Sequence, residues 1–201
     1  MALNIWALSI VKALGLGYPP AQLVFLRAAV GLVLIAPWLW RDRAAFRNLH
    51  ALPLHVARVA CSTLALTASF YALARLPFAL VSAIGFTRPF IMMGLAALLL
   101  GERIPNRRWL AALLAFAGVL VAVDPQALDA PVTGLAAMAL TVLFGSLAII
   151  LTRKLSATPV VVMMGLYTAG LTAFTAPAAA VGWTAIAPEH MAALLAIGIF
   201  A

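Results

Sequence analysis

The chain has 201 residues, of which 66% are hydrophobic and 9% are charged, and its formal net charge is +8. Soluble domains carry about 25% charged residues, so this composition excludes an ordinary soluble protein. The positive charge does not indicate a nucleic-acid-binding protein, because the basic residues lie in short linkers between apolar runs and form no stripe on a polar face. We expect an integral membrane protein surrounded by the lipid bilayer.

The apolar runs at the two ends of the chain are shorter than the others. A helix needs about 20 apolar residues to cross about 30 Å of hydrocarbon. Residues 1–14 and 189–201 fall short of that length, so we interpret them as spans cut by the limits of this sequence. The chain is expected to be a fragment of a longer protein or a natural truncation of one.

Between these ends, six longer apolar runs predict membrane-spanning helices, and prolines lie at or near their boundaries. The predicted spans are residues 21–39, 56–74, 77–100, 109–123, 133–151 and 159–181. The span at 109–123 is short, and Arg107 and Arg108 are expected to lengthen it because their stems reach toward the headgroups. The sequence therefore predicts an all-α, polytopic membrane protein with seven to eight helices in this chain.

The linkers between these spans alternate in charge. Those that follow the spans at 21–39, 77–100 and 133–151 are basic, whereas the others are poor in base or carry acid. Basic residues gather on the cytoplasmic side of membrane proteins, so this pattern predicts a multi-pass chain with a cytoplasmic N-terminus. The bases assigned to the cytoplasmic side are Arg41, Arg43, Arg47, Arg58, Arg103, Arg107, Arg108, Arg153 and Lys154.

Arg88 lies at the centre of the predicted span 77–100, near the middle of the bilayer. A charge at that depth costs at least about 2.5 kcal/mol, so it normally faces the bundle interior or a wet cavity. Pro89 lacks an amide hydrogen and leaves the carbonyl of Gly85 without its helical partner. Transporters build substrate sites from such broken helices at mid-membrane. We predict that Arg88 attracts the substrate beside this broken backbone; pairing with a neighbouring helix is the structural alternative.

Other polar and aromatic residues within the apolar runs are weaker candidates. Arg27 lies within reach of the headgroups and is assigned a structural role. Lys12 is either a path residue or an interfacial anchor. Aromatic residues in spans pack or anchor at the interface more often than they line a path. Those considered as lining are Trp6, Phe70, Tyr71, Phe86 and Tyr167, of which Trp6, Tyr71 and Phe86 are preferred.

All five acidic residues lie in linkers or at span ends. Exporters that exchange a cationic drug for protons usually need a carboxylate inside the membrane. A lone intramembrane cation instead favours a substrate with a carboxylate or another anionic group, including a zwitterion. Enzymatic chemistry is not supported, because no His-Glu-x-x-His motif or buried Ser/His/Asp set is present. We therefore predict neither an enzyme, nor a metal site, nor a cofactor.

Several motifs along the chain resemble those of the EamA family of the drug/metabolite transporter superfamily. They are residues 70–77, Arg88-Pro89-Phe90, Leu100-Gly101-Glu102-Arg103, Gly118-Val119, Asp124-Pro125, Trp6-Ala7-Leu8-Ser9 with Lys12, and Phe25-Leu26-Arg27. The resemblance implies ten helices in two inverted five-helix repeats around a central cavity. Residues 1–123 would form the first repeat and residues 133–201 the start of the second. Arg88 departs from the family pattern, in which the residue before this proline is more often uncharged.

Internal evidence for a repeat comes from two pairs of prolines that are 140 residues apart, Pro19 with Pro159 (159 − 19) and Pro37 with Pro177 (177 − 37). Pro19 and Pro37 lie near the ends of one predicted span, and Pro159 and Pro177 lie near the ends of another.

Glu102 is expected to bond Arg103, Arg107 or Arg108 and to fix the turn after the span 77–100. That role is structural or gating, because a helix C-terminus disfavours a bound anion.

The function predicted from the sequence is an inner-membrane transporter that moves a small organic metabolite by alternating access. Arg88, Pro89 and Gly85 form its predicted site, with Phe86, Tyr71, Trp6 and Lys12 along the path. The alternatives are a non-transporting membrane subunit or scaffold, and an inactive transporter fragment. Assembly of the protein as a homodimer is a further alternative.

Overall fold

The structure is a computed structural model that describes residues 17–48, 51–122, 130–187 and 190. Every regular element in these residues is helical. The helices are α2 (Pro20–Arg41), the short 3-10 helix η1 (Arg43–Asn48), α3 (Leu52–Arg75), α4 (Phe78–Gly85), α5 (Arg88–Leu100), α6 (Asn106–Ala122), α7 (Val132–Lys154) and α8 (Val160–Val181). Trp6 and Lys12 lie outside the described residues, as does the predicted first span.

The predicted all-helical membrane fold is confirmed. Five segments are long and apolar enough to cross a membrane, namely α2, α3, α4 with α5, α7 and α8. Each predicted span coincides with helical structure to within a few residues. The span at 77–100 contains the predicted break and consists of two helices, α4 and α5, separated at Phe86 and Thr87. The interruption precedes Pro89, which lies in the first turn of α5, where its missing amide hydrogen costs no helical hydrogen bond.

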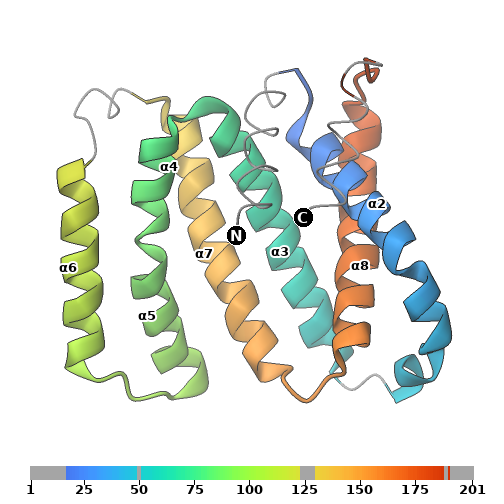
Figure 1. Cartoon of the computed structure of the whole chain (residues 1–201), viewed down its shortest axis with the longest axis horizontal. Coiled ribbons are helices and arrows are strands. Elements are labelled where there is room, and N and C mark those ends of the chain that lie inside the picture. Colours follow the sequence, from blue (N-terminus) through green and yellow to red (C-terminus); the bar gives the residue numbers. More distant parts are fainter. Residues whose placement is uncertain (1–16, 49–50, 123–129, 188–189, 191–201) are drawn as a thin grey trace.

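The long helices stand side by side, and their order in space differs from their order in the sequence. In Figure 1, α7 lies between α5 and α3, and α8 lies between α3 and α2. The segments that join α2 to α3, α5 to α6 and α7 to α8 lie at one edge of the molecule (Figure 1). The three basic linkers therefore share one edge, as the alternation of charge requires.

Arg58 lies at the contact between α3 and α8. It lies in the second turn of α3, is only 7% exposed, and its Nη2 donates a hydrogen bond of 2.9 Å to the carbonyl of Met163 on α8. Arg58 therefore belongs to the α3–α8 interface. Its position in the sequence, close to a span end, does not reveal which face of α3 turns toward α8.

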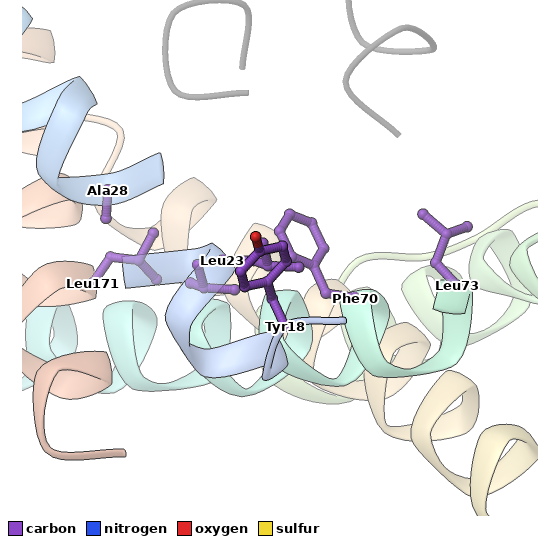
Figure 2. Packing of buried hydrophobic residues seen from close by; sticks show 7 residues of the cluster. Tyr18, Leu23, Ala28, Phe70, Leu73 and Leu171 are labelled. Carbon is purple, nitrogen blue, oxygen red and sulfur yellow. The ribbon is translucent and has the colours of Figure 1, made fainter. Parts of the chain in front are cut away.

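A buried apolar cluster joins α2, α3 and α8. Figure 2 shows Leu23 and Ala28 of α2 with Phe70 and Leu73 of α3 and Leu171 of α8. Val24 of α2, which belongs to this cluster, is 0% exposed. Close apolar packing of this kind holds the helices in register, since lipid offers no hydrophobic driving force between them.

Polar contacts fasten the beginning of α2 to the segment after α8. Gln22 is fully buried, and its amide donates to the carbonyl of Thr184 at 2.8 Å and accepts from the Thr184 N–H at 3.0 Å. The Tyr18 hydroxyl lies 2.9 Å from Nδ1 of His190. The start of α2 therefore meets the end of α8, so the two helices run antiparallel.

Replacing Gly170 by valine is expected to weaken the α3–α8 contact. A Cβ at Gly170 would lie 2.7 Å from Cγ1 of Val59, a stiff side chain that is 3% exposed. Overpacking of a close contact costs about 1–3 kcal/mol, so the midpoint of thermal unfolding in detergent should fall by several degrees.

The matched control is Gly94→Val on α5, where an added Cβ meets nothing within 4 Å. That variant should melt within about one degree of the parent, because surface changes rarely exceed about 0.5 kcal/mol. Equal melting of the two valine variants would show that Gly170 does not mark a tight contact.

Candidate functional site

The break between α4 and α5 is closed by local hydrogen bonds. The Phe86 N–H donates to the carbonyl of Ser82 at 3.0 Å, and the Thr87 N–H donates to that of Ile84 at 3.0 Å. The Thr87 hydroxyl donates to the same Ile84 carbonyl at 2.6 Å. These bonds end α4 at Gly85, and α5 begins at Arg88.

Arg88 is the first residue of α5, and its side chain extends toward α7. Its Nη2 lies 3.5 Å from the position that a Cβ on Gly145 would occupy. Its Nε is buried without a hydrogen-bond partner, and the structure gives the guanidinium no ion pair with a described residue. Arg88 is therefore a cation in the middle of a membrane-spanning segment without a charged partner among the described residues.

The Arg88 side chain lines a cavity of about 260 Å³ between α3, α5, α7 and α8, which we call the Arg88 cavity. Glycine at position 145 leaves room for the guanidinium against α7. The polar side chains that line the cavity are Ser62, Ser69, Arg88, Thr141, Thr152 and Tyr167. The cavity thus combines one guanidinium with hydroxyl groups inside an otherwise apolar bundle.

The hydroxyl groups of the cavity differ in their availability. Thr141 donates to the carbonyls of Ala137 and Ala65, and Thr152 donates to that of Ala148. Within the described part of the chain, the hydroxyls of Ser62 and Ser69 have no hydrogen-bond partner. The two serines on α3 are therefore the groups best placed to bond a solute that enters the cavity.

The other predicted site residues line two cavities that are distinct from the Arg88 cavity. Gly85, Phe86 and Pro89 line a second, open hollow of about 510 Å³ that Arg88 also borders. Tyr71 lies elsewhere, in an apolar hollow, with the Arg75 guanidinium 3.6 Å above its ring. The structure therefore joins Arg88 to Gly85, Phe86 and Pro89 but does not bring Tyr71 to the Arg88 cavity.

Arg27 and Tyr167 face each other across α2 and α8. Arg27 is half-buried and interacts electrostatically with Tyr167, which lines the Arg88 cavity.

The predicted ion-pair partner of Glu102 differs from the one in the structure, so that prediction is wrong. Its Oε1 lies 3.6 Å from Nη1 of Arg153, at the end of α7, and the structure gives it no ion pair with Arg103, Arg107 or Arg108. Those three bases follow Glu102 along the chain, but α7 packs against α5 and brings Arg153 to the turn. Both side chains of this ion pair are about half exposed.

The hydroxyl residues of the cavity were not predicted from the sequence. A signal for them exists, because Ser62 and Ser69 are seven residues apart, as are Gly145 and Thr152, and this spacing places both members of a pair on one helix face. Tyr167 was among the aromatic candidates, but nothing local distinguished it from the others.

Comparison with known proteins gives a consistent set of relatives. Residues 1–123 match the EamA-like transporter family. The chain is 31% identical over 149 residues to the pseudopaline exporter CntI of Pseudomonas aeruginosa, an alignment that covers 74% of this chain and 52% of that protein. It is 34% identical over 110 residues to a riboflavin transporter of Brucella anthropi, covering 54% and 38% of the two chains.

A solved crystal structure shares the fold, with a TM-score of 0.68 at 22% identity. The superposition covers 98% of this chain and 73% of that one. The chain spans about half the length of the curated relatives named above.

Proposed function

This chain belongs to the EamA-like transporter family, and from that premise we propose that it forms part of a transporter for a small organic metabolite. The observation that carries the proposal is Arg88, a cation without an ion-pair partner in the described structure, in a cavity lined by free serine hydroxyls at a helix break. Such a site suits a carboxylate-bearing or zwitterionic solute, because a guanidinium binds a carboxylate through two parallel hydrogen bonds.

Two inverted repeats would provide the alternating-access mechanism. In support, α2 and α8 both have 22 residues, begin directly after Pro19 and Pro159, and contain Pro37 and Pro177 at equivalent positions. The two helices also run antiparallel, as inverted repeats require. We propose that the first repeat ends near residue 123 and that the second begins near residue 133.

The contacts between α2 and α8 support the same symmetry. A Cβ on Gly31 would lie 3.8 Å from Thr168, and Ala28 belongs to the same buried cluster as Leu171 (Figure 2). At the offset of 140 residues, Gly31 corresponds to Leu171 (31 + 140) and Thr168 corresponds to Ala28 (168 − 140). The pair Gly31–Thr168 is therefore equivalent to the pair Leu171–Ala28. A twofold relation would exchange the pairs in this way.

The orientation proposed for the whole protein places the edge with the basic linkers in the cytoplasm. The structure gathers these linkers at one edge (Figure 1), and the enrichment of Lys and Arg on the cytoplasmic side supports the assignment. The N-terminus would then be cytoplasmic, and the membrane would be the inner membrane of the cell.

The test of the proposed function uses the whole natural protein, reconstituted in vesicles, with radiolabelled short-chain carboxylates and amino acids as probes. We expect saturable accumulation of at least one anionic or zwitterionic probe relative to protein-free vesicles. Linear uptake of every probe, no faster than in protein-free vesicles, would favour a scaffold or an inactive subunit instead.

The ion pair between Glu102 and Arg153 is proposed to restrain the cytoplasmic end of the Arg88 cavity, because Thr152 lines that cavity. A half-exposed ion pair contributes about 0.2–1 kcal/mol, so its loss would change the ratio of conformations up to about fivefold. Glu102→Arg or Arg153→Glu alone should therefore change the thiol-labelling rate of a Ser62→Cys reporter in a Cys61→Ala background.

The double variant, Glu102→Arg with Arg153→Glu, is the control, since it reverses the pair without removing the attraction. Its labelling rate should return to that of the parent reporter. Changes in the single variants that simply add in the double variant would show that the two residues act independently.

A further inference from the structure

Arg58 is a second buried arginine beside the Arg88 cavity, and the proposed site does not yet use it. It is 7% exposed, and one of its nitrogens donates to the carbonyl of Met163. Its Nε is buried without a hydrogen-bond partner. A guanidinium carries five N–H donors, so this arginine retains unused donors in a dry environment.

The position of Arg58 connects it to the wall of the cavity. On α3, Arg58 precedes the cavity residue Ser62 by four positions and Ser69 by eleven, which places all three on one face of the helix. Its Cζ lies 5.8 Å from the ring centre of Tyr167, and Tyr167 lines the cavity. Arg58 therefore lies behind Tyr167 in the wall of the cavity, one helical turn from Ser62 and toward the basic linkers.

Three arginines interact with Tyr167 or line the cavity with it. Arg58 and Arg27 both interact with Tyr167, and Arg88 lines the same cavity. The acids in the described ranges are Asp42 and Glu102; Asp42 is exposed just beyond α2, and Glu102 pairs with Arg153. The structure shows no ion pair between either acid and Arg58 or Arg88. Two cations without a described counterion are costly within a membrane, unless a ligand supplies the negative charge.

We propose that Arg58, with Tyr167, forms a second anion-binding subsite of the Arg88 cavity, and that the solute carries two anionic groups. This inference rests on the proposed transport function. One anionic group pairs with Arg88 and the other with the free donors of Arg58, while the hydroxyls of Ser62 and Ser69 bond the segment between them. The two arginines come from α3 and α5, so they recognise the spacing between the groups as well as their charge.

The test compares dicarboxylates with monocarboxylates of equal carbon number on the whole natural protein, purified in detergent. The probes are succinate, glutarate and adipate against butyrate, pentanoate and hexanoate, and affinities are measured from the thermal stabilisation that each produces. We expect at least one dicarboxylate to bind about tenfold or more tightly than its monocarboxylate, because it makes a second charge-assisted contact.

The variants separate the two subsites. Arg58→Gln should weaken the preferred dicarboxylate about tenfold more than its monocarboxylate, whereas Arg88→Gln should weaken both. Arg75→Gln, an exposed arginine of the same helix, should change neither affinity. If Arg58→Gln does not fold, Arg58→Lys replaces it, because lysine keeps the charge and should retain part of the preference for the dicarboxylate. Tyr167→Phe tests whether the Tyr167 hydroxyl contributes to dicarboxylate binding.

Two results would overturn this inference alone: no dicarboxylate preference in the parent protein, or the same preference in Arg58→Gln as in the parent. In either case saturable binding of a monocarboxylate would leave the proposed function standing. Absence of binding by every carboxylate would contradict the carboxylate specificity in the proposed function, and this inference with it.

Discussion

Replacing Arg88 by alanine should reduce transport by about a hundredfold and leave the amount of inserted protein unchanged. The guanidinium has no ion pair with any described residue, and its Nε is buried without a partner. Its removal therefore breaks no stabilising pair there and relieves the cost of a charge at mid-membrane. The lost charge-assisted contact with an anionic solute is worth about 1.5–3 kcal/mol, or about 10- to 150-fold.

The measurement is saturable uptake by reconstituted vesicles, normalised to folded protein from size-exclusion chromatography. Arg88→Lys keeps the charge but not the planar fork, so it should retain part of the activity. Arg75→Ala is the matched control, because that arginine is exposed and contacts Tyr71 outside the Arg88 cavity. A parallel loss of folded protein and uptake in Arg88→Ala would instead establish the structural alternative.

The second large effect is expected from Gly145→Val, which should lower transport to less than about a tenth. A Cβ at this position would lie 3.5 Å from Nη2 of Arg88 and 3.8 Å from Cβ of Ala65, so alanine fits at ordinary contact distance. The two further methyl groups of valine would occupy the Arg88 cavity and displace the guanidinium. A shift of about 1 Å in a binding group is enough to reduce activity about a hundredfold.

A graded series distinguishes blockage from general damage. Gly145→Ala should keep most of the uptake, whereas valine should lower it to less than about a tenth with little change in the melting temperature. Gly94→Val provides a control for valine in a membrane helix, since an added Cβ there meets nothing within 4 Å. Normal uptake by Gly145→Val would show that the solute does not use this cavity.

Most of the helix positions follow from the sequence, because their determinants are local. Span length depends on continuous hydrophobicity, and the prolines that precede α2, α7 and α8 mark where each helix begins. The mid-span break was also predictable from Pro89, although the exact point of interruption was not. Arg88 was identified because a charge in an apolar run is conspicuous without knowledge of its neighbours.

The partners of these residues were not predictable. The sequence favoured nearby bases for Glu102, whereas the structure pairs it with Arg153, 51 positions further on (153 − 102). Arg58 was placed at the cytoplasmic start of its span, and the sequence did not reveal that it is buried against α8. Both differences arise because α7 and α8 pack beside helices that precede them by many residues (Figure 1).

The sequence alone therefore determined that this is a multi-pass helical chain, where its helices lie, and that it carries a cation in the middle of an apolar span. Only the tertiary structure decided which helix faces meet, and so which residues form the Arg88 cavity. In a soluble protein, apolar periodicity reveals the buried face of a helix, because the opposite face is polar. In a membrane both faces are apolar, since lipid and the bundle interior have similar polarity, and the information that orients each helix resides in packing between distant segments.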